Sequence, residues 1–402
     1  MNTKTRFGAD FWDQTKRHPF RRLQSMIYLD HNATTGVAPC VLEEMMPVFG
    51  TDFANPANTF HIAGRRAADC VDLARNRVAG QFGGSPSRVI FTSGSTEALN
   101  LAIKGLSLSG SRNRILVGAT EHKAVLEAAI ARRDAIVEMI PVRQDGTIDL
   151  DVLSQMLGED VALMSLMAAN NETGTLHPVN AAFNLASQCG ALTLCDATQA
   201  VGRIKISEFN CADFISLSAH KIYGPKGVGC LVATREGFSS LSPIIDGGGQ
   251  ERGLRSGTIN VPGVVGLGAA VELVCGEFET EVVRLRSLRD RLFRGLEDRI
   301  SDVVLNGHEV QRLCNTVNVR FVGADGEAVL ANLQRVAAST GSACQSAVPA
   351  PSHVLTAMGL SRVAADESLR FSLGRTTTEI EIDLAIEDIA TAVNRVRTLL
   401  GS

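Results

Sequence analysis

The fold is clearest from one stretch of the sequence, Phe214-Ile-Ser-Leu-Ser-Ala-His-Lys-Ile-Tyr-Gly-Pro-Lys-Gly-Val-Gly-Cys-Leu-Val-Ala233. Its two apolar runs, Phe214–Leu217 and Val228–Ala233, have the length and composition of buried β-strands. Between the runs lie serine hydroxyls, His220, Lys221 and a Gly/Pro turn, a composition typical of a loop. Ligands of α/β sheets bind where strands end and loops begin, so this loop is a candidate site.

Similar apolar runs recur upstream and alternate with stretches of helical periodicity. They are Arg88–Phe91, Arg114–Val117, Val161–Met167 and Ala191–Cys195. A helix is predicted over Glu97–Lys104, directly after the first of these runs. Such alternation predicts an α/β fold whose large sheet is mostly parallel.

The pattern changes from about residue 262. Leucines 285, 288, 292 and 296 repeat every three or four residues, as on one face of an amphipathic helix. Two strand-like runs follow, Asn315–Phe321 and Ser368–Leu373, with helices predicted near 328–332 and 381–399. We therefore expect a large domain over residues 26–261 and a smaller α+β domain over residues 262–402. Residues 26–40 are a candidate to pack on the small domain.

The composition excludes several classes of function. The 402 residues include 39 Lys+Arg and 43 Asp+Glu, a net charge of −4, which argues against nucleic acid as the direct partner. Aromatic residues make up only 5%, too few for a base-stacking surface. No apolar run reaches the roughly 18 residues of a membrane helix. With 45% hydrophobic residues, the chain can bury a large core.

The cysteines indicate a reducing compartment. There are nine, an odd number, no Cys-x-x-Cys pair occurs, and several lie inside apolar runs. We therefore expect free thiols and a cytoplasmic protein rather than a disulfide framework. No His or Cys pair has zinc-finger spacing, so no metal site is expected.

Residues 1–25 form a basic extension that we expect to be flexible. They contain Lys4, Arg6, Lys16 and further arginines, but no apolar segment of a secretory signal. The segment also has two acidic residues and little serine, which makes it a poor transit peptide. An ordinary surface extension, or a start at Met26, explains it better.

Two motifs suit the binding of an anion and of a ring nitrogen. Phe91-Thr-Ser-Gly-Ser-Thr-Glu97 predicts a strand, a tight turn and a helix start, where backbone N–H groups and the hydroxyls of Ser95 and Thr96 could hold a phosphate. The alternative is simple helix capping. Asp196 follows a buried strand, with Gln199 close behind. It is either a helix cap or the carboxylate that keeps a pyridine nitrogen protonated.

Two further motifs carry groups for covalent and proton chemistry. Lys221 lies just after a strand and beside Ser218 and His220. A surface lysine is the ordinary interpretation, but this setting suits an amine that forms a Schiff base. His122 follows another strand and is either structural or a group that moves protons near neutral pH.

Taken in order, these motifs resemble one family over residues 27 to 399. The chain is similar to the cysteine desulfurases of the NifS/IscS-like group, which are class V aminotransferase-family, fold type I pyridoxal phosphate (PLP) enzymes. The matching stretches are Tyr28-Leu-Asp-His-Asn-Ala-Thr-Thr35, Asn55-Pro56, Thr92-Ser-Gly-Ser-Thr-Glu97, Glu121-His-Lys123, Asn170-Asn-Glu-Thr-Gly174, Asp196-Ala-Thr-Gln199, Ser218-Ala-His-Lys-Ile-Tyr-Gly-Pro-Lys226, Glu251-Arg-Gly-Leu-Arg-Ser-Gly-Thr258, Gly341-Ser-Ala-Cys344 and Arg370-Phe-Ser-Leu-Gly-Arg375.

The resemblance implies a role for each matching residue. Lys221 would hold the cofactor, Asp196 would pair with its ring nitrogen, and Gln199 would contact its phenolic oxygen. His122 would stack on the ring and transfer protons. The remaining implied contacts are to the phosphate, by Thr96, Ser218, His220 and a Thr258 from the second subunit of a homodimer, and to the substrate carboxylate, by Asn171 and Arg370.

Cys344 would be the nucleophile, because it alone among the cysteines lies in the Ser-Ala-Cys motif of the family. Its neighbours are small or polar, whereas most other cysteines lie in apolar sequence, where a thiol is usually a small hydrophobe. With few large apolar side chains before Val348, its segment is predicted to be a movable loop. The implied reaction converts L-cysteine to L-alanine and leaves a persulfide on Cys344.

Several alternatives stay open on the sequence. The same scaffold could serve a selenocysteine lyase or another PLP-dependent lyase or aminotransferase, and a non-catalytic sulfur-transfer scaffold is a third possibility. The sulfur acceptor is a partner of unknown identity, from an iron–sulfur scaffold, tRNA thiolation or DNA phosphorothioation pathway. The chain stops at Ser402, soon after its last predicted helix, without the longer tail of housekeeping iron–sulfur members.

Overall fold

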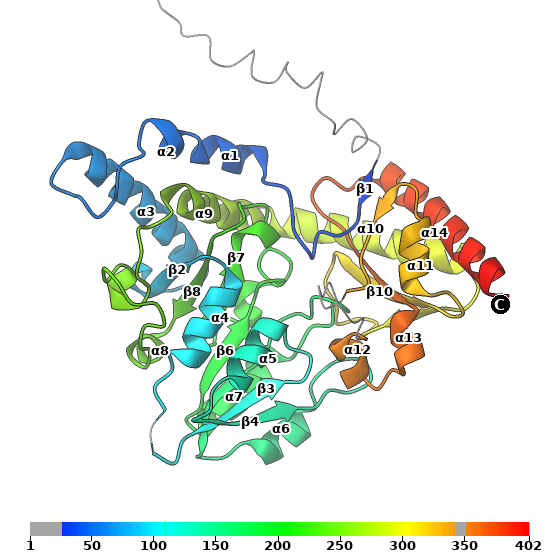
Figure 1. The fold of residues 1–402 in the computed structure, drawn as a ribbon, viewed down its shortest axis with the longest axis horizontal. Coiled ribbons are helices and arrows are strands. Elements are labelled where there is room, and N and C mark those ends of the chain that lie inside the picture. The colour runs from blue at the N-terminus through cyan, green and yellow to red at the C-terminus, as the bar shows by residue number, and fades with distance from the viewer. Residues whose placement is uncertain (1–25, 109, 342–350, 402) are drawn as a thin grey trace, which may run out of the picture.

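The computed structural model describes residues 26–108, 110–341 and 351–401 (Figure 1). The N-terminal extension, residues 1–25, and Cys344 lie outside these described residues.

A seven-stranded sheet forms the centre of the larger part of the molecule. Its order is β2 (Val89–Thr92), β8 (Gly229–Ala233), β7 (Phe214–Ser218), β6 (Leu192–Asp196), β5 (Val161–Ser165), β3 (Arg114–Gly118) and β4 (Ile136–Ile140). Only β8 runs against its neighbours, so the other strands end at the same edge of the sheet. Strands β2, β5, β7 and β8 are buried along their whole length, which explains their continuous apolar sequences.

Alternate residues of the strands face two different hydrophobic layers. Leu116 and Ile215 belong to the core on one face, which includes residues of α3 (Ile62–Gln81), α7 (Val179–Gln188) and α9 (Val261–Gly276). Their neighbours in the chain face a second core, which includes residues of α4 (Ser95–Lys104) and α5 (Lys123–Ile130). The sheet is therefore sandwiched between two helical layers, as the side-chain period of two requires.

The shorter elements complete this part of the chain. They are α1 (Pro39–Met45), α2 (Pro47–Gly50), η3 (Pro86–Arg88), α6 (Leu150–Met156), η4 (Ile206–Glu208), η5 (Ala219–Lys221), α8 (Arg235–Ser239) and η6 (Glu251–Gly253).

A three-stranded antiparallel sheet lies at the centre of the smaller part. Its order is β12 (Ser368–Ser372), β10 (Thr316–Phe321) and β9 (Val303–Asn306). Helices α10 (Phe278–Arg299) and α14 (Glu379–Leu400) contribute to a separate core with it, and the predicted leucine stripe 285–296 is buried there. The other elements are α11 (Gly326–Asn332), β11 (Val336–Ala337), α12 (His353–Ala357) and α13 (Arg362–Asp366).

The start of the described chain joins this smaller part. Strand β1 (Ile27–Tyr28) pairs in parallel with β11, and Ile27 and Leu29 are buried in the smaller core. The predicted fold class, a mostly parallel α/β sheet with a smaller α+β part, is confirmed. The division at residue 262 stays a prediction, since α9 crosses it while packing in the larger core.

Among the described helices, none is by itself long and apolar enough to span a membrane. Of these helices, only α9 and α10 taken together have the length and composition of a membrane span, and the pair is bent by 74° at its junction.

Candidate active site

A cavity of about 650 Å³ lies at the edge of the large sheet where the parallel strands end. Its lining combines residues after β2, β3, β6 and β7 with Asn32 from the N-terminal segment and with His353 and Arg370 from the smaller part. The predicted site residues that line it are Ser95, Thr96, His122, Asn171, Asp196, Gln199, Ser218, His220, Lys221 and Arg370.

Lys221 ends the short helix η5 that follows β7. Its Nζ donates hydrogen bonds to the carbonyls of Asn32 at 2.6 Å and Ala33 at 2.8 Å. Burial, followed by the charges of Arg370 and Arg203, lowers the pKa of Lys221 to about 8, against the opposing effect of acidic neighbours. A sizeable fraction of the amine is therefore neutral near pH 7.5, as attack on an aldehyde requires.

Asp196 is the last residue of β6 and is only 6% exposed. Its Oδ1 accepts a hydrogen bond from the Thr198 N–H at 2.9 Å. Glu121, fully buried nearby, has a pKa raised well above its usual value by burial and by the charge of Asp196. Of the two carboxyl groups, only Asp196 lines the cavity.

His122 follows β3 and is the N-cap of α5. Its Nδ1 accepts the Ala124 N–H at 3.1 Å, so the neutral ring carries its hydrogen on Nε2. The loss of water around the ring lowers its pKa, against the opposing charge of Asp196. His122 is therefore neutral at pH 7 and presents an N–H donor.

The turn from β2 into α4 forms an anion-binding corner. Gly94 precedes the helix with φ of 157°, and a Cβ at Gly229 would stand 2.7 Å from the Gly94 Cα, so the two backbones touch. The Ser95 hydroxyl is bonded at 2.7 Å to the hydroxyls of Ser216 and Thr198, whereas Thr96 is exposed at the cavity. The start of α4 thus offers backbone N–H groups and a hydroxyl to an anion.

His220 and Ser218 lie beside this corner, at the end of β7. The His220 Nδ1 is 3.1 Å from the Thr34 hydroxyl, and burial lowers its pKa to about 4. The imidazole is therefore a neutral hydrogen-bonding group at physiological pH.

Arg370 brings a buried guanidinium from β12 to the opposite side of the cavity. Its terminal nitrogens donate to the Asn171 carbonyl at 2.9 Å and to the Asp30 carboxylate at 2.6 Å. Its Nε is buried without a hydrogen-bond partner in the described structure. An Arg side chain with an unused donor beside a cavity suits a carboxylate ligand.

Among the lining residues that were given no role from the sequence are Asn32, Glu172 and His353. The first two lie in stretches that were recognised but given no role, and Asn32 accepts hydrogen bonds through its carbonyl from both Lys221 and Gln199. His353 lies on α12, which is far along the chain from any strand of the large sheet. In the folded protein its Nε2 donates to the Glu121 carbonyl at 2.9 Å. No local pattern marks it as a site residue.

Two predicted residues lie elsewhere. Thr258 lines a separate pocket of about 270 Å³ together with Asn55 and Pro56. Cys344 is outside the described residues, but Gly341, three positions before it, lines the main cavity.

None of the cysteines in the described ranges lines that cavity. The described residues also contain no cluster of three or more His, Cys, Asp or Glu suited to a metal ion.

Comparisons with known proteins show the family of the chain. The family model described as aminotransferase class-V matches residues 27–384. A protein named cysteine desulfurase from Frankia sp. (strain EuIK1) is 48% identical, and the alignment covers 94% of this chain and 93% of that protein.

Solved structures show the same likeness. A NifS-like protein superposes with a TM-score of 0.85 at 35% identity, covering 92% of this chain and all of that one. The structure described as SspA in complex with cysteine superposes with a TM-score of 0.75 at 33% identity, covering 86% of this chain and 98% of that one.

Proposed function

The chain belongs to the aminotransferase class-V family and is a cysteine desulfurase, and from this premise we propose how its cavity takes sulfur from L-cysteine. The cofactor is PLP, covalently bound at Lys221. The products are L-alanine and a persulfide on Cys344. The observation that carries this proposal is one cavity in which a lysine of lowered pKa, a buried carboxylate and a helix N-terminus meet.

The residues present fit this cofactor. The Lys221 amine matches an aldehyde, the Asp196 carboxylate matches a protonated ring nitrogen, and the start of α4 with Thr96 matches a phosphate. When bound, PLP supplies an electron sink that stabilises negative charge at the substrate Cα. Gln199 would donate to its phenolic oxygen, while His122 would stack on its ring.

Lys221 and His122 handle protons in this proposal. With its pKa lowered to about 8, the Lys221 Nζ can be neutral and accept the Cα proton of the substrate. His122, neutral with its hydrogen on Nε2, can donate a hydrogen bond into the cavity, and its ring can pass on a proton after it has taken one up.

Arg370 and Asn171 orient the substrate. The unused Nε of Arg370 and the Asn171 side chain would bind the α-carboxylate of L-cysteine, as the resemblance implies. Because Arg370 is already held by Asp30 and the Asn171 carbonyl, it is preorganised and loses little conformational freedom on binding.

Cys344 accepts the sulfur. Its thiolate forms an S–S bond with the substrate sulfur while the substrate C–S bond breaks. The electron pair of that bond stays on the substrate Cβ, which takes up a proton to give alanine. No cysteine of the described ranges reaches the cavity wall, whereas Gly341 does, which supports Cys344 as the acceptor.

Product analysis tests the proposal. With PLP and a thiol reductant, the protein is expected to form alanine and sulfide from L-cysteine in equal amounts. Faster turnover of L-selenocysteine, with no need for Cys344, would favour the lyase, and conversion of keto acids would favour an aminotransferase. A colourless protein that takes up no PLP would favour a non-catalytic scaffold.

Replacing Asp196 with asparagine is expected to slow alanine formation by about 10²-fold or more while PLP stays attached at Lys221. The amide keeps the shape but lacks the charge that holds the ring nitrogen protonated. Asp213→Asn is the matched control, because the Asp213 carboxylate accepts hydrogen bonds from Thr193 of β6 and does not line the cavity. Equal rates for Asp196→Asn and the parent would contradict the assigned role.

A homodimer with shared active sites is the second part of the proposal. Thr258 lies outside the cavity, in a pocket shared with Asn55 and Pro56. The segment around Asn55 and Pro56 also contains two exposed aromatic side chains, Phe53 at 76% and Phe60 at 98% exposure, which association would bury. A closed pair with a two-fold axis would cover them and bring each Thr258 toward the partner's phosphate corner.

Light scattering is expected to give twice the chain mass of 42.8 kDa. Thr258→Val is expected to weaken PLP binding about tenfold without dissociating the dimer, because one hydroxyl is lost. A single-chain mass with full PLP occupancy and activity would refute the shared site.

We also propose that the protein acts in the cytoplasm and passes its sulfur to an acceptor protein of unknown identity. Its described cysteines are all free thiols, which suits a reducing compartment. Affinity capture from native cells would show whether the acceptor belongs to iron–sulfur assembly, tRNA thiolation or DNA phosphorothioation.

A further inference from the structure

Arg203 is a buried cation held by neutral groups. It follows β6 in the chain and is 6% exposed. In the described part of the chain, no carboxylate lies within 4.0 Å of its guanidinium nitrogens. Burial lowers the pKa of Arg203, which shows how little compensation the charge receives. A buried charge of this kind costs stability unless its hydrogen bonds compensate for the lost water.

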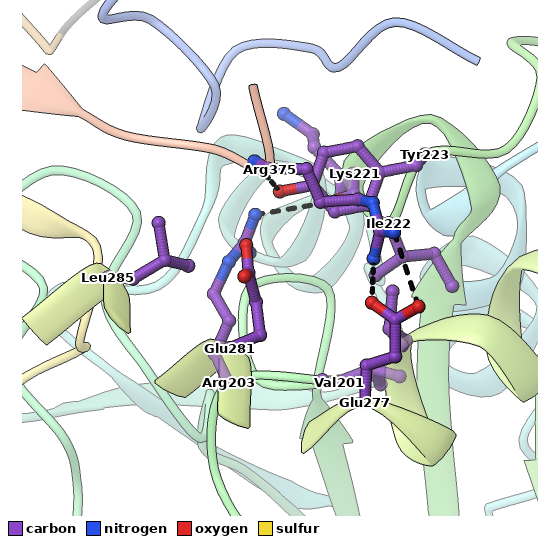
Figure 2. Close-up of a pocket in the computed structure, with 11 residues that line it drawn as sticks. Val201, Arg203, Lys221, Ile222, Tyr223, Glu277, Glu281, Leu285 and Arg375 are labelled. Atoms are coloured by element: carbon purple, nitrogen blue, oxygen red, sulfur yellow. Dashed lines mark hydrogen bonds and ion pairs between the residues drawn. The ribbon is translucent and has the colours of Figure 1, made fainter. Parts of the chain in front are cut away.

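The small cavity around Arg203 shows why it lacks an acidic partner. This cavity of about 20 Å³ is also lined by Glu277, Glu281 and Arg375 (Figure 2). Glu277 binds Arg375, which lies over the Tyr223 ring, and Glu281 binds Arg284 outside the lining. The nearby carboxylates are thus engaged, and the donors of Arg203 go to the active site instead.

One set of these donors orients Gln199. The Arg203 Nη1 donates to the Gln199 carbonyl at 3.0 Å and to its Oε1 at 2.8 Å. Because a guanidinium only donates, the Gln199 Oε1 must face Arg203, and the Nε2 lies on the other side, donating to the Asn32 carbonyl at 3.0 Å. The second Nε2 hydrogen is left for the cavity that Gln199 lines.

The other terminal nitrogen reaches the lysine. The Arg203 Nη2 donates to the Lys221 carbonyl at 3.0 Å, and Figure 2 shows the guanidinium directed toward that main chain. After burial and the charge of Arg370, the charge of Arg203 is a further cause of the lowered pKa of Lys221. The other charged or titratable groups that interact with Lys221 are Asp30, His122, Asp196, His220 and Arg370.

We propose that Arg203 is a positioning residue of the active site: it locks the Gln199 carboxamide with its Nε2 toward the cofactor pocket, and it places a positive charge against the main chain of Lys221. This role rests on the proposed binding of PLP at Lys221. The proposal predicts one consequence of removing the positive charge of Arg203 and a different consequence of replacing its planar guanidinium with another cation.

The test compares full-length, PLP-loaded Arg203→Met, Arg203→Lys and Arg289→Met. Arg289 is the control, because it is buried to a similar extent and donates to the Leu313 carbonyl, but it pairs with Asp290 on α10 and does not line the cavity. The visible absorption band of bound PLP is titrated from pH 6 to 10, and thermal melting is recorded for each protein.

A cation disfavours a proton added at Nζ, so losing it makes protonation easier and moves the titration midpoint upward. Arg203→Met is expected to raise the midpoint by about one pH unit and to shift the band wavelength. Arg203→Lys is expected to restore the midpoint but not the wavelength, because one ammonium cannot hold Gln199 and the Lys221 carbonyl as a fork does. Arg289→Met is expected to lower the melting temperature only.

A parental midpoint and wavelength in Arg203→Met would overturn the proposal, as would the same shifts in Arg289→Met. Equal midpoints in Arg203→Met and Arg203→Lys would overturn the role of the charge. If the parent protein itself shows no visible band with PLP, the cofactor assignment fails, and the role of Arg203 fails with it.

Discussion

Cys344→Ser is expected to bind PLP and L-cysteine and yet form no alanine above background, a loss of roughly 10³-fold or more. Serine keeps the size and polarity of the side chain but lacks the soft sulfur nucleophile that must attack the substrate sulfur. Alanine and sulfide are measured together, and the cofactor absorption shows that the protein is still loaded.

The described cysteines supply the controls for this experiment. Cys314 is buried in the smaller core and Cys40 is exposed, and neither lines the active-site cavity. Serine at position 40 should leave alanine formation unchanged, and serine at position 314 should lower stability rather than remove the reaction. Parental turnover by Cys344→Ser would exclude a persulfide at this position and favour direct elimination of the substrate sulfur.

Lys221→Ala is expected to remove covalent PLP binding and to abolish alanine formation, because Nζ both attaches the cofactor and takes the Cα proton. Borohydride reduction of the parent, followed by peptide mass spectrometry, should place the pyridoxyl label on Lys221. Lys226 also lines the cavity and provides the comparison, since Lys226→Ala should leave the label on Lys221. A label on Lys226 or Lys123 would contradict the assignment.

The pH dependence of cofactor capture gives an independent check on Lys221. Only the neutral amine attacks the aldehyde, and the pKa of Lys221 is lowered from 10.5 to about 8. The rate at which the apoprotein takes up PLP should therefore rise from pH 7 to pH 8 and level off above about pH 9. A rate that still rises steeply at pH 10 would mean that the amine has an ordinary pKa.

Most of the large fold and much of the candidate site could be predicted from local sequence. The runs around Arg114, Val161 and Phe214 are continuously apolar because helices cover both faces of their sheet. Polar residues placed directly after such runs, Asp196 and Lys221 among them, meet because parallel strands end at one edge.

Residues contributed by distant segments could not be predicted in the same way. His353 reaches the cavity from α12, and its sequence neighbourhood has no strand of the large sheet to mark it. Arg203, four residues after Gln199, was given no role from the sequence. Its burial and its lack of a carboxylate within the described structure follow from where Gln199, Lys221 and the α9–α10 junction lie.

The sequence by itself determined where the strands lie along the chain and which polar residues follow each of them, because hydrophobic periodicity and the residues that end a strand are local properties. The tertiary structure alone decided how reactive those residues are. The pKa of Lys221 depends on burial and on charges from Arg370 and Arg203, which belong to other elements and approach only when both cores have formed. Electrostatic interactions act through space and gain strength where water is removed, so they follow from packing and not from spacing in the chain.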